Sequence, residues 1–326
     1  MALARERASI GHHGSDQTVT SLSLRMIRAA LVLTRARNTF FNPDRFSGPS
    51  ARKRRPTDSR PPRRLSSGAR ISRDDLDGWP VYIITPSAPQ GRAPRESRGE
   101  ILFLHGGGYA LEINAAQWRL AATLARRTGR TVTVPIYPLT PEHTYRDVFP
   151  TLLRVYGRMH EHARAVGPEH AAPVAVIGES AGAGMALALV QAISLALRPT
   201  DLILLSPWLD AVMADPAIDV LGRTDALLSP EHLRTLGAFF ASPDDPGIPQ
   251  VSPINGPLND LGRLLVFAGT RDLLHLDARR LERLVRAAGG SIDYREFVGM
   301  IHDWMLFPIP EARDVLKVIV QRLAVR

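Results

Sequence analysis

Short apolar runs alternate with longer amphipathic segments from residue 81 onward, and this rhythm constrains the fold more than any other feature of the sequence. The runs lack the polar alternation of a half-exposed sheet, so the strands that they predict are covered on both faces. Strands of this kind, separated by helices, indicate a parallel sheet between layers of helices. The sequence therefore predicts an α/β fold. The expected strands are 81–84, 101–105, 132–137, 174–178, 202–205, 264–268 and 292–297, and the expected helices are 115–128, 146–166, 181–197, 277–288 and 311–323.

One interval interrupts this rhythm. Between the runs 202–205 and 264–268, the chain devotes residues 206–263 to a proline-rich stretch with a single short helical pattern at 231–240. Connections between a helix and a strand are normally a few residues long, and an excursion of this length commonly forms a lid. We therefore expect residues 206–263 to be an insertion that caps a site on the main domain.

The positive charge of the chain is confined to its N-terminal part. The 326 residues carry 41 Lys and Arg against 32 Asp and Glu, a net charge of +9. Residues 1–80 hold 16 of the basic and 7 of the acidic side chains, and 16 − 7 is again +9, so the remainder is neutral. A nucleic-acid enzyme is expected to carry its basic surface on the domain that does the chemistry. The basic run 49–64 also has no aromatic residue for base stacking, so no nucleic-acid partner is predicted.

The composition divides the chain into an N-terminal arm with a cap helix (1–48), a basic, proline-rich linker (49–78) and a catalytic domain (79–326). Within the arm, residues 21–37 predict an amphipathic helix with arginines on one face. The other face combines Leu22, Met26, Ala29, Ala30 and Leu33. Two interpretations stay open: the helix caps the pocket, or residues 21–64 make a peripheral contact with an anionic membrane. A homodimer also stays open.

The sequence contains no cysteine, which excludes a disulfide scaffold, a thiol nucleophile and any thiolate metal site. The longest apolar stretch, 181–197, is only 17 residues and is short for a bilayer span. Arg28 interrupts the apolar run near the N-terminus, so a cleavable signal peptide is not expected. These features together predict a cytoplasmic protein that is at most peripheral to a membrane.

The strongest chemical signal is Gly178-Glu179-Ser180-Ala181-Gly182, directly between an expected strand and an expected helix. A serine on such a sharp strand-to-helix turn projects at the carboxyl edge of the sheet, and glycines on both sides avoid collisions between side chains. The start of the helix directs free N–H groups at a developing negative charge. This context favours a catalytic serine over a helix that is merely packed closely on a strand.

His105-Gly106-Gly107-Gly108-Tyr109 ends another expected strand. Consecutive glycines let backbone amides approach a ligand, and this pattern supplies oxyanion donors in lipases and esterases. We assign the N–H groups of Gly106, Gly107 and Ala181 to an oxyanion hole, and an orienting role to His105. A phosphate-binding loop is the alternative, but the segment lacks both the Lys-Ser/Thr of a P-loop and the spacing of a dinucleotide motif.

A catalytic serine needs a base, and the base needs an orienting group. His302 follows the last expected strand, and Asp272 follows the strand 264–268. Both therefore come after the carboxyl ends of parallel strands, where open α/β sheets build their sites. The order Ser180, Asp272, His302 is typical of serine hydrolases on this kind of sheet.

These motifs resemble the hormone-sensitive-lipase-like branch of the α/β-hydrolase esterases. The resemblance rests on the two glycine motifs, Ser206-Pro-Trp-Leu-Asp210, Asp272-Leu-Leu274 and His302-Asp-Trp304, and covers residue 81 to the C-terminus. It implies an α/β-hydrolase fold, a Ser–His–Asp carboxylic ester hydrolase that needs no cofactor, and a cap built from the N-terminal helices and residues 206–263. Two departures are Glu179, where the family commonly has Asp, and Pro138 in place of an Arg.

We therefore expect hydrolysis of a small ester of short to medium acyl chain, with no metal and no cofactor. The same triad would also serve a lactone or amide hydrolase. A non-catalytic small-molecule receptor on this fold is the rival from another class; such receptors typically lose the base, whereas His302 is present. The residues expected to line the substrate pocket are Gly108, Tyr109, Glu179, Trp208, Leu209 and Trp304.

Overall fold

The computed structural model describes residues 20–47, 59–62, 65, 68–87, 97–165 and 173–324. Most of the basic run 49–64 and the first 19 residues of the arm lie outside the described residues. No helix of the described part of the chain combines the length and the hydropathy needed to cross a membrane.

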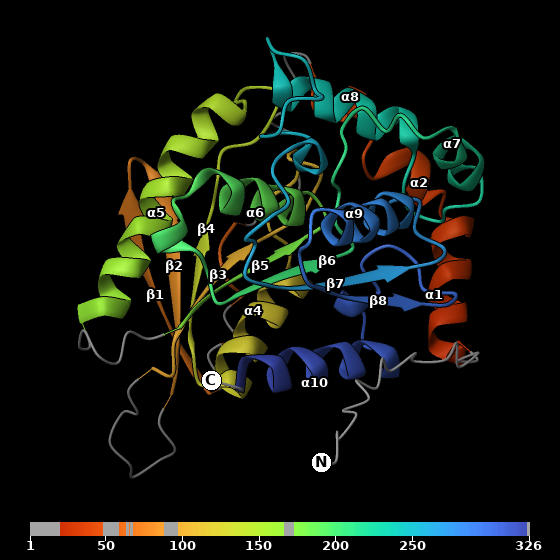
Figure 1. Cartoon of the computed structure of the whole chain (residues 1–326). Coiled ribbons are helices and arrows are strands. Elements are labelled where there is room, and N and C mark those ends of the chain that lie inside the picture. Colours follow the sequence, from red (N-terminus) through yellow and green to blue (C-terminus); the bar gives the residue numbers. More distant parts are fainter. Residues whose placement is uncertain are drawn as a thin grey trace, which may run out of the picture.

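A single sheet of eight strands forms the centre of the molecule, in the order β1-β2-β4-β3-β5-β6-β7-β8 (Figure 1). All neighbouring pairs from β4 to β8 are parallel, whereas β2 pairs antiparallel with β1 and β4. All seven expected strands are present, and the expected α/β fold is confirmed. The strands are β1 Ala69–Leu76, β2 Trp79–Pro86, β3 Glu100–Leu104, β4 Thr131–Pro135, β5 Val174–Glu179, β6 Asp201–Leu205, β7 Arg263–Gly269 and β8 Ile292–Phe297.

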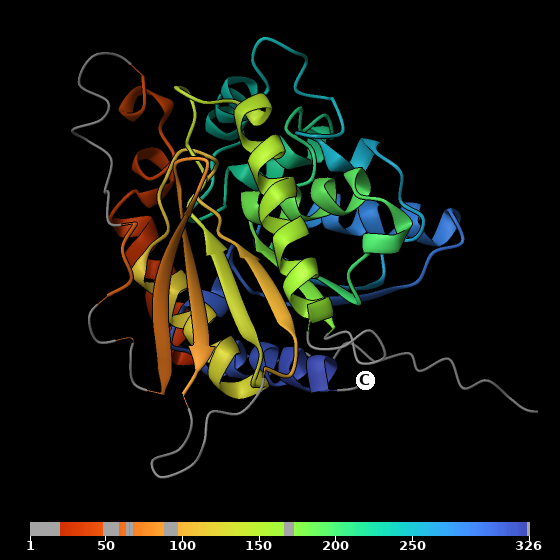
Figure 2. The ribbon, with the colours of Figure 1, turned by 90° about the vertical axis from the view of Figure 1, so that its left-hand side faces the viewer.

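The predicted linker, residues 49–78, is wrong at its C-terminal end, because residues 69–76 form strand β1. It pairs with β2 along its whole length at the edge of the sheet (Figure 2). Only its terminal residues Ala69 and Leu76 are buried, and charged side chains fill most of the strand between them, so its composition resembles that of a linker. Asp77 and Gly78, both at positive φ, form the two-residue hairpin turn; such a dipeptide is the signal that would have revealed the strand.

Helices cover both faces of the sheet, as the buried strands require. In Figure 1, α5, α6 and α9 lie on one face and α4 and α10 on the other. Successive residues of β3 alternate between the two apolar layers: Leu102 and Leu104 face the first, Ile101 and Phe103 the second. The helices are α1 Leu22–Leu33, α2 Ala36–Thr39, α4 Ala115–Thr128, α5 Tyr145–Ala165, α6 Ala181–Ala192, α7 Pro216–Gly222, α8 Pro230–Ala241, α9 His275–Ala287 and α10 Pro310–Ala324.

The insertion 206–263 carries α7, α8 and the short 3-10 helix η4 (Pro253–Asn255). Figure 1 shows α7 and α8 beside α2. Helix α8 contacts the 3-10 helix η1 (Pro43–Arg45) of the arm. Carbon atoms of Phe41 from the arm and Leu236 from α8 both lie 3.1 Å from where a β-carbon on Gly108 would stand. The described part of the arm and the insertion therefore meet over the glycine loop that follows β3.

Candidate active site

Ser180 occupies a strained turn between the last residue of β5 and the first residue of α6. Its backbone has φ +53° and ψ −120°, a positive-φ conformation that non-glycine residues adopt rarely. A β-carbon on Gly178 would lie 2.3 Å from the carbonyl oxygen of Gly182. One on Gly182 would lie 2.2 Å from the carbonyl oxygen of Leu104. Gly178 is therefore required for the start of α6 to lie against the end of β5, and Gly182 for it to lie against the end of β3.

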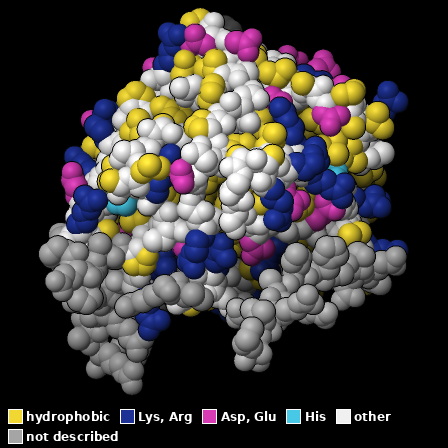
Figure 3. Space-filling model, in the orientation of Figure 1, with side chains coloured by type: hydrophobic (Ala, Val, Ile, Leu, Met, Phe, Trp, Pro, Cys, Tyr) yellow, Lys and Arg dark blue, Asp and Glu magenta, His cyan; other side chains and the backbone are white. Residues whose placement is uncertain are grey.

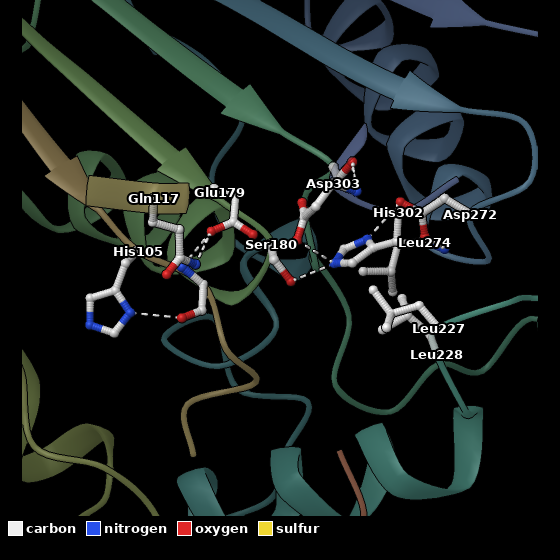
Figure 4. A network of polar contacts seen from close by, with 12 residues as sticks. His105, Gln117, Glu179, Ser180, Leu227, Leu228, Asp272, Leu274, His302 and Asp303 are labelled. Atoms are coloured by element: carbon white, nitrogen blue, oxygen red, sulfur yellow. Dashed lines mark hydrogen bonds and ion pairs between the residues drawn. The ribbon is translucent and has the colours of Figure 1, made fainter. Parts of the chain in front are cut away.

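Three residues from separate loops form a continuous hydrogen-bonded chain at the carboxyl edge of the sheet (Figure 4). His302 Nε2 is 2.9 Å from Ser180 Oγ, and His302 Nδ1 is 2.8 Å from Asp272 Oδ2. Asp272 lies in the turn after β7, where its other oxygen accepts the N–H of Leu274 at 2.9 Å. His302 lies between β8 and the 3-10 helix η5 (Trp304–Leu306). All three side chains are buried, so the polar contacts among them are shielded from water.

In the glycine loop after β3, one of the three predicted oxyanion donors, Gly106, is already engaged in a hydrogen bond. The N–H of Gly106 donates to Glu179 Oε2 at 2.8 Å, so it is not available to an oxyanion. Within the described chain, no hydrogen bond engages the N–H of Gly107, Gly108 or Ala181. Gly107 and Gly108 have φ +119° and +60°, conformations suited to glycine. The N–H groups of the expected donors Gly107 and Ala181 are thus free, whereas that of Gly106 is not, and Gly108 offers a further free N–H in the same loop.

His105 is fixed by its own neighbours, as an orienting residue would be. Its Nδ1 contacts the carbonyl oxygen of Gly106 at 2.7 Å, and its ring stacks on Tyr137 at 4.3 Å between centroids. The hydroxyl of Tyr137 donates to the carbonyl oxygen of His105 at 2.6 Å. Burial lowers the pKa of His105 to about 4, so the ring is neutral at ordinary pH.

Two buried carboxyl groups lie next to the serine and the imidazole. Glu179 Oε2 accepts from Gln117 Nε2 at 2.5 Å as well as from Gly106, which ties the start of α4 to the glycine loop. Burial, and then the facing Asp303, raise the pKa of Glu179 well above its usual range. Asp303 Oδ2 lies 3.0 Å from His302 Nε2. Neither Gln117 nor Asp303 was a predicted site residue, because neither contact follows from motif spacing.

Glu179, His302 and Asp303 are, among the described residues, the one group with the residue types and spacing to hold a metal ion. The existing hydrogen bonds of His302 Nε2 and Glu179 Oε2 already account for this grouping, and we assign no metal to it.

The protonated form of His302 is stabilised by its surroundings. Burial opposes a charge on the ring, but Asp272 and Asp303 outweigh it and raise the pKa of His302 well above its usual value. Asp225, from the insertion, supports Asp272 from the other side: its Oδ2 accepts the N–H of Leu273 at 2.9 Å. Burial and then Asp272 raise the pKa of Asp225 to about 6. The insertion is therefore connected directly to the loop that carries Asp272.

A cavity of about 650 Å³ reaches the site at Gly107, Glu179 and Asp303, whereas Ser180 and His302 are not among its lining residues. Of the six expected pocket residues, only Glu179 lines it. Trp208 and Leu209 are instead core residues. Tyr109 stacks on Phe240 at 3.9 Å between ring centroids, and Trp304 packs against Phe297. Gly108 lies beneath Phe41 and Leu236. The walls of the cavity come instead from the arm, the insertion and the segment at η5, none of which contains a sequence motif at these positions. They include Leu31, Phe40, Phe41, Leu227, Leu306 and Phe307.

The chain is similar to known proteins both in sequence and in fold. A family model described as the alpha/beta hydrolase fold matches residues 101–306. A Mycobacterium tuberculosis protein named as an acetyl-hydrolase is 32% identical over 272 residues, which cover 80% of this chain and 82% of that protein. An acetyl-hydrolase of Streptomyces hygroscopicus is 30% identical over 231 residues, 70% of this chain and 76% of its own. The crystal structure of an esterase from the bacterial hormone-sensitive lipase family shares the fold, with a TM-score of 0.72 at 24% identity, over 93% of this chain and 98% of that one.

Proposed function

Because this chain belongs to the α/β-hydrolase family, as a carboxylic ester hydrolase of its hormone-sensitive-lipase-like branch, we propose that it cleaves esters through an acyl-enzyme on Ser180. His302 is the general base and Asp272 its orienting partner. The observation that carries this proposal is the unbroken chain of hydrogen bonds from Asp272 through His302 to Ser180, with both distances below 3 Å.

The chemistry proceeds in two halves. Ser180 Oγ attacks the ester carbonyl carbon while its proton passes to His302 Nε2, and Asp272 holds the Nδ1–H and stabilises the imidazolium. His302 then gives the proton to the leaving alkoxide, which departs as the alcohol. In the second half, water attacks the acyl-enzyme, again with His302 as base, and releases the acid and free Ser180.

The negative charge that develops on the carbonyl oxygen needs donors fixed in advance. We assign this role to the N–H groups of Gly107, Gly108 and Ala181, the last at the start of α6, where the helix dipole adds positive potential. Removing one such donor from an enzyme of this kind costs roughly 3–4 kcal/mol of transition-state stabilisation.

The acyl group is short to medium in length. The cavity that reaches the site at Glu179 and Asp303 has mostly apolar walls and a volume of about 650 Å³, enough for a small ester. Two relatives named as acetyl-hydrolases support the short end of this range. The cap is assigned to the described part of the arm, residues 20–47, and to the insertion 206–263, because Leu31, Phe41 and Leu227 from these segments line the cavity.

Substitution of the nucleophile tests the mechanism. Ser180→Ala is expected to abolish hydrolysis of p-nitrophenyl butyrate and labelling by a fluorophosphonate, with an unchanged circular dichroism spectrum. Ser72→Ala, on the exposed edge strand β1, is the matched control and is expected to retain full activity. Full activity of Ser180→Ala would exclude the mechanism. Absence of fluorophosphonate labelling, together with no turnover of any ester, lactone or amide in a panel, would favour the receptor.

Helix α1 supports a second role, peripheral binding to an anionic membrane. Its inward face consists of buried Leu24 with half-buried Ile27 and Leu31. The face expected from the sequence to be apolar points outward instead, with Leu22, Met26 and Leu33 exposed by 68%, 60% and 85%. Solvent-exposed apolar side chains of this size on one helix are typical of an interaction surface.

The charge around this face is complementary to anionic lipid. Residues 20–47 contain five arginines and one acidic residue, Asp44, and Lys and Arg side chains are visible along the edge of the molecule where α1 lies (Figure 3). An apolar face flanked by basic residues binds at the interface of an anionic bilayer. Leu31 and Phe40, at the inner side of α1 and just after α2, also line the substrate cavity, so docking would bring the cavity to the lipid.

Vesicle sedimentation tests this role. The full chain is expected to sediment with phosphatidylglycerol vesicles at low salt and much less with phosphatidylcholine vesicles. Replacing Met26 and Leu33 by serine should abolish sedimentation. Replacing Leu195 and Val220, which are exposed by 66% and 65% and lie outside α1, should not. Loss of a concentration-dependent dimer on Met26→Ser and Leu33→Ser, without any vesicle binding, would assign the face to a second copy of the chain.

A further inference from the structure

Asp303 makes a contact that a Ser–His–Asp triad does not require. Its Oδ2 lies 3.0 Å from His302 Nε2, the same nitrogen that lies 2.9 Å from Ser180 Oγ (Figure 4). The backbone fixes this position, because Asp303 has φ +54° and its N–H donates to Ser206 Oγ at 3.1 Å. His302 therefore has a carboxyl group on each of its two ring nitrogens.

The two protonation states of the ring differ in how they fit this arrangement. A neutral ring that donates Nδ1–H to Asp272 has a lone pair at Nε2, which accepts the Ser180 hydroxyl but repels an ionised Asp303. A protonated ring carries a hydrogen on both nitrogens and satisfies both carboxylates. The position of Asp303 thus favours the protonated ring, which is unable to act as a base.

Among the other groups around His302, Asp272 acts in the same direction, from the loop after β7. Glu179, at the end of β5, and Asp225, behind Asp272, also lie on this side of the site, but their raised pKa values reduce the negative charge that they direct at the ring. Across the described ranges, no Lys or Arg side chain pairs with Asp272, Asp303 or Glu179 to offset this charge. The raised pKa of His302 has the same origin: burial opposes the charge, and Asp272 and Asp303 prevail.

We propose that Asp303 is a positioning residue that holds the protonated His302 ring through Nε2 and thereby sets the pH at which the ring becomes available to Ser180. This inference rests on the proposed function, because it requires His302 to be the base. As the pH rises, the Nε2 proton leaves to solvent and the ring becomes neutral. The Ser180 hydroxyl then donates to the freed lone pair, and the enzyme becomes active.

The test is the pH dependence of kcat/KM for p-nitrophenyl acetate hydrolysis in the full chain. Asp303→Asn keeps the shape of the side chain, and asparagine tolerates positive φ better than most residues. An opposite charge at this distance commonly changes a pKa by about 1–3, so the midpoint of the acid limb is expected to fall by about 1 pH unit or more. Asp314→Asn, on the exposed surface of α10, is the matched control and should leave the midpoint unchanged.

A purely structural role for Asp303 predicts a different result. Activity would then fall by the same factor at every pH and the midpoint would stay in place, which would overturn the proposal. Asp303→Gly, which φ +54° also tolerates, provides the second variant if the asparagine protein fails to fold. The two proposals remain distinguishable: hydrolysis that survives Ser180→Ala removes the proposed function, whereas Ser180-dependent hydrolysis with an unmoved midpoint removes only this inference.

Discussion

Substituting Gly182 by alanine should disturb both folding and catalysis, because the start of α6 has no room for a side chain. The added β-carbon would lie 2.2 Å from the carbonyl oxygen of Leu104 and 2.4 Å from that of His105, whereas an ordinary contact at this position is 3.4 Å or longer. Helix α6 must therefore retreat from the end of β3 by about 1 Å. Overpacking a core in this way costs about 1–3 kcal/mol, and two backbone contacts place this site at the upper end.

The same displacement moves Ser180 and the Ala181 N–H relative to the glycine loop. A misplacement of about 1 Å at a catalytic site reduces the rate by about 100-fold. The matched control is Gly157→Ala in the middle of α5, where a β-carbon would meet nothing within 4 Å. This control is expected to gain about 0.5–1 kcal/mol from the better helix propensity of alanine.

Urea unfolding and p-nitrophenyl acetate hydrolysis measure the two effects on the same proteins. We expect a lower unfolding midpoint and a lower kcat/KM for Gly182→Ala, and a slightly higher midpoint with unchanged kcat/KM for Gly157→Ala. If Gly182→Ala matched the wild type in both measurements, the packing argument for the serine turn would be refuted.

Three further changes probe the site and its support. Asp272→Asn should lower kcat by roughly 10⁴-fold without unfolding the protein, because the ring loses the partner that fixes its tautomer; a loss below tenfold would contradict the role of Asp272. Burial, and then Asp210, raise the pKa of Asp277 to about 7, so between pH 4 and 7 the folded state retains a proton that the unfolded state releases. The free energy of unfolding then falls as the pH rises, and Asp277→Asn should raise the thermal midpoint at pH 8 more than at pH 4; equal increments at both would argue against it. Leu227→Ala enlarges the cavity and should raise the ratio of hexanoate to acetate kcat/KM; an unchanged ratio would mean that the acyl chain lies elsewhere.

The fold and the triad were accessible from the sequence for the same reason: both depend on local patterns. Apolar runs without alternation identify buried parallel strands, and parallel strands bring their carboxyl ends to one edge, where Ser180, Asp272 and His302 meet. Strand β1 was missed because it is charged along most of its length and gains its pairing from β2 rather than from burial of its own side chains.

The failures at the site depend on contacts between residues distant in the sequence. Gly106 and Glu179 are 73 positions apart, and their hydrogen bond removes an amide that motif reasoning had assigned to the oxyanion hole. The aromatic residues Tyr109, Trp208 and Trp304 pack in the core, while the cavity takes its walls from the arm and the insertion. Asp303 contacts His302 Nε2, the nitrogen that also contacts Ser180, because the chain turns at positive φ immediately after His302.

Trapping of the acyl-enzyme shows whether Ser180 is the nucleophile. The protein is quenched in acid during turnover of p-nitrophenyl acetate, and its peptides are mapped by mass spectrometry. We expect an acetyl group on Ser180 in the wild type, more of it in Asp272→Asn if deacylation slows more than acylation, and none on that peptide in Ser180→Ala. An acetyl group on another residue as the productive intermediate, or turnover that persists without Ser180, would contradict this assignment.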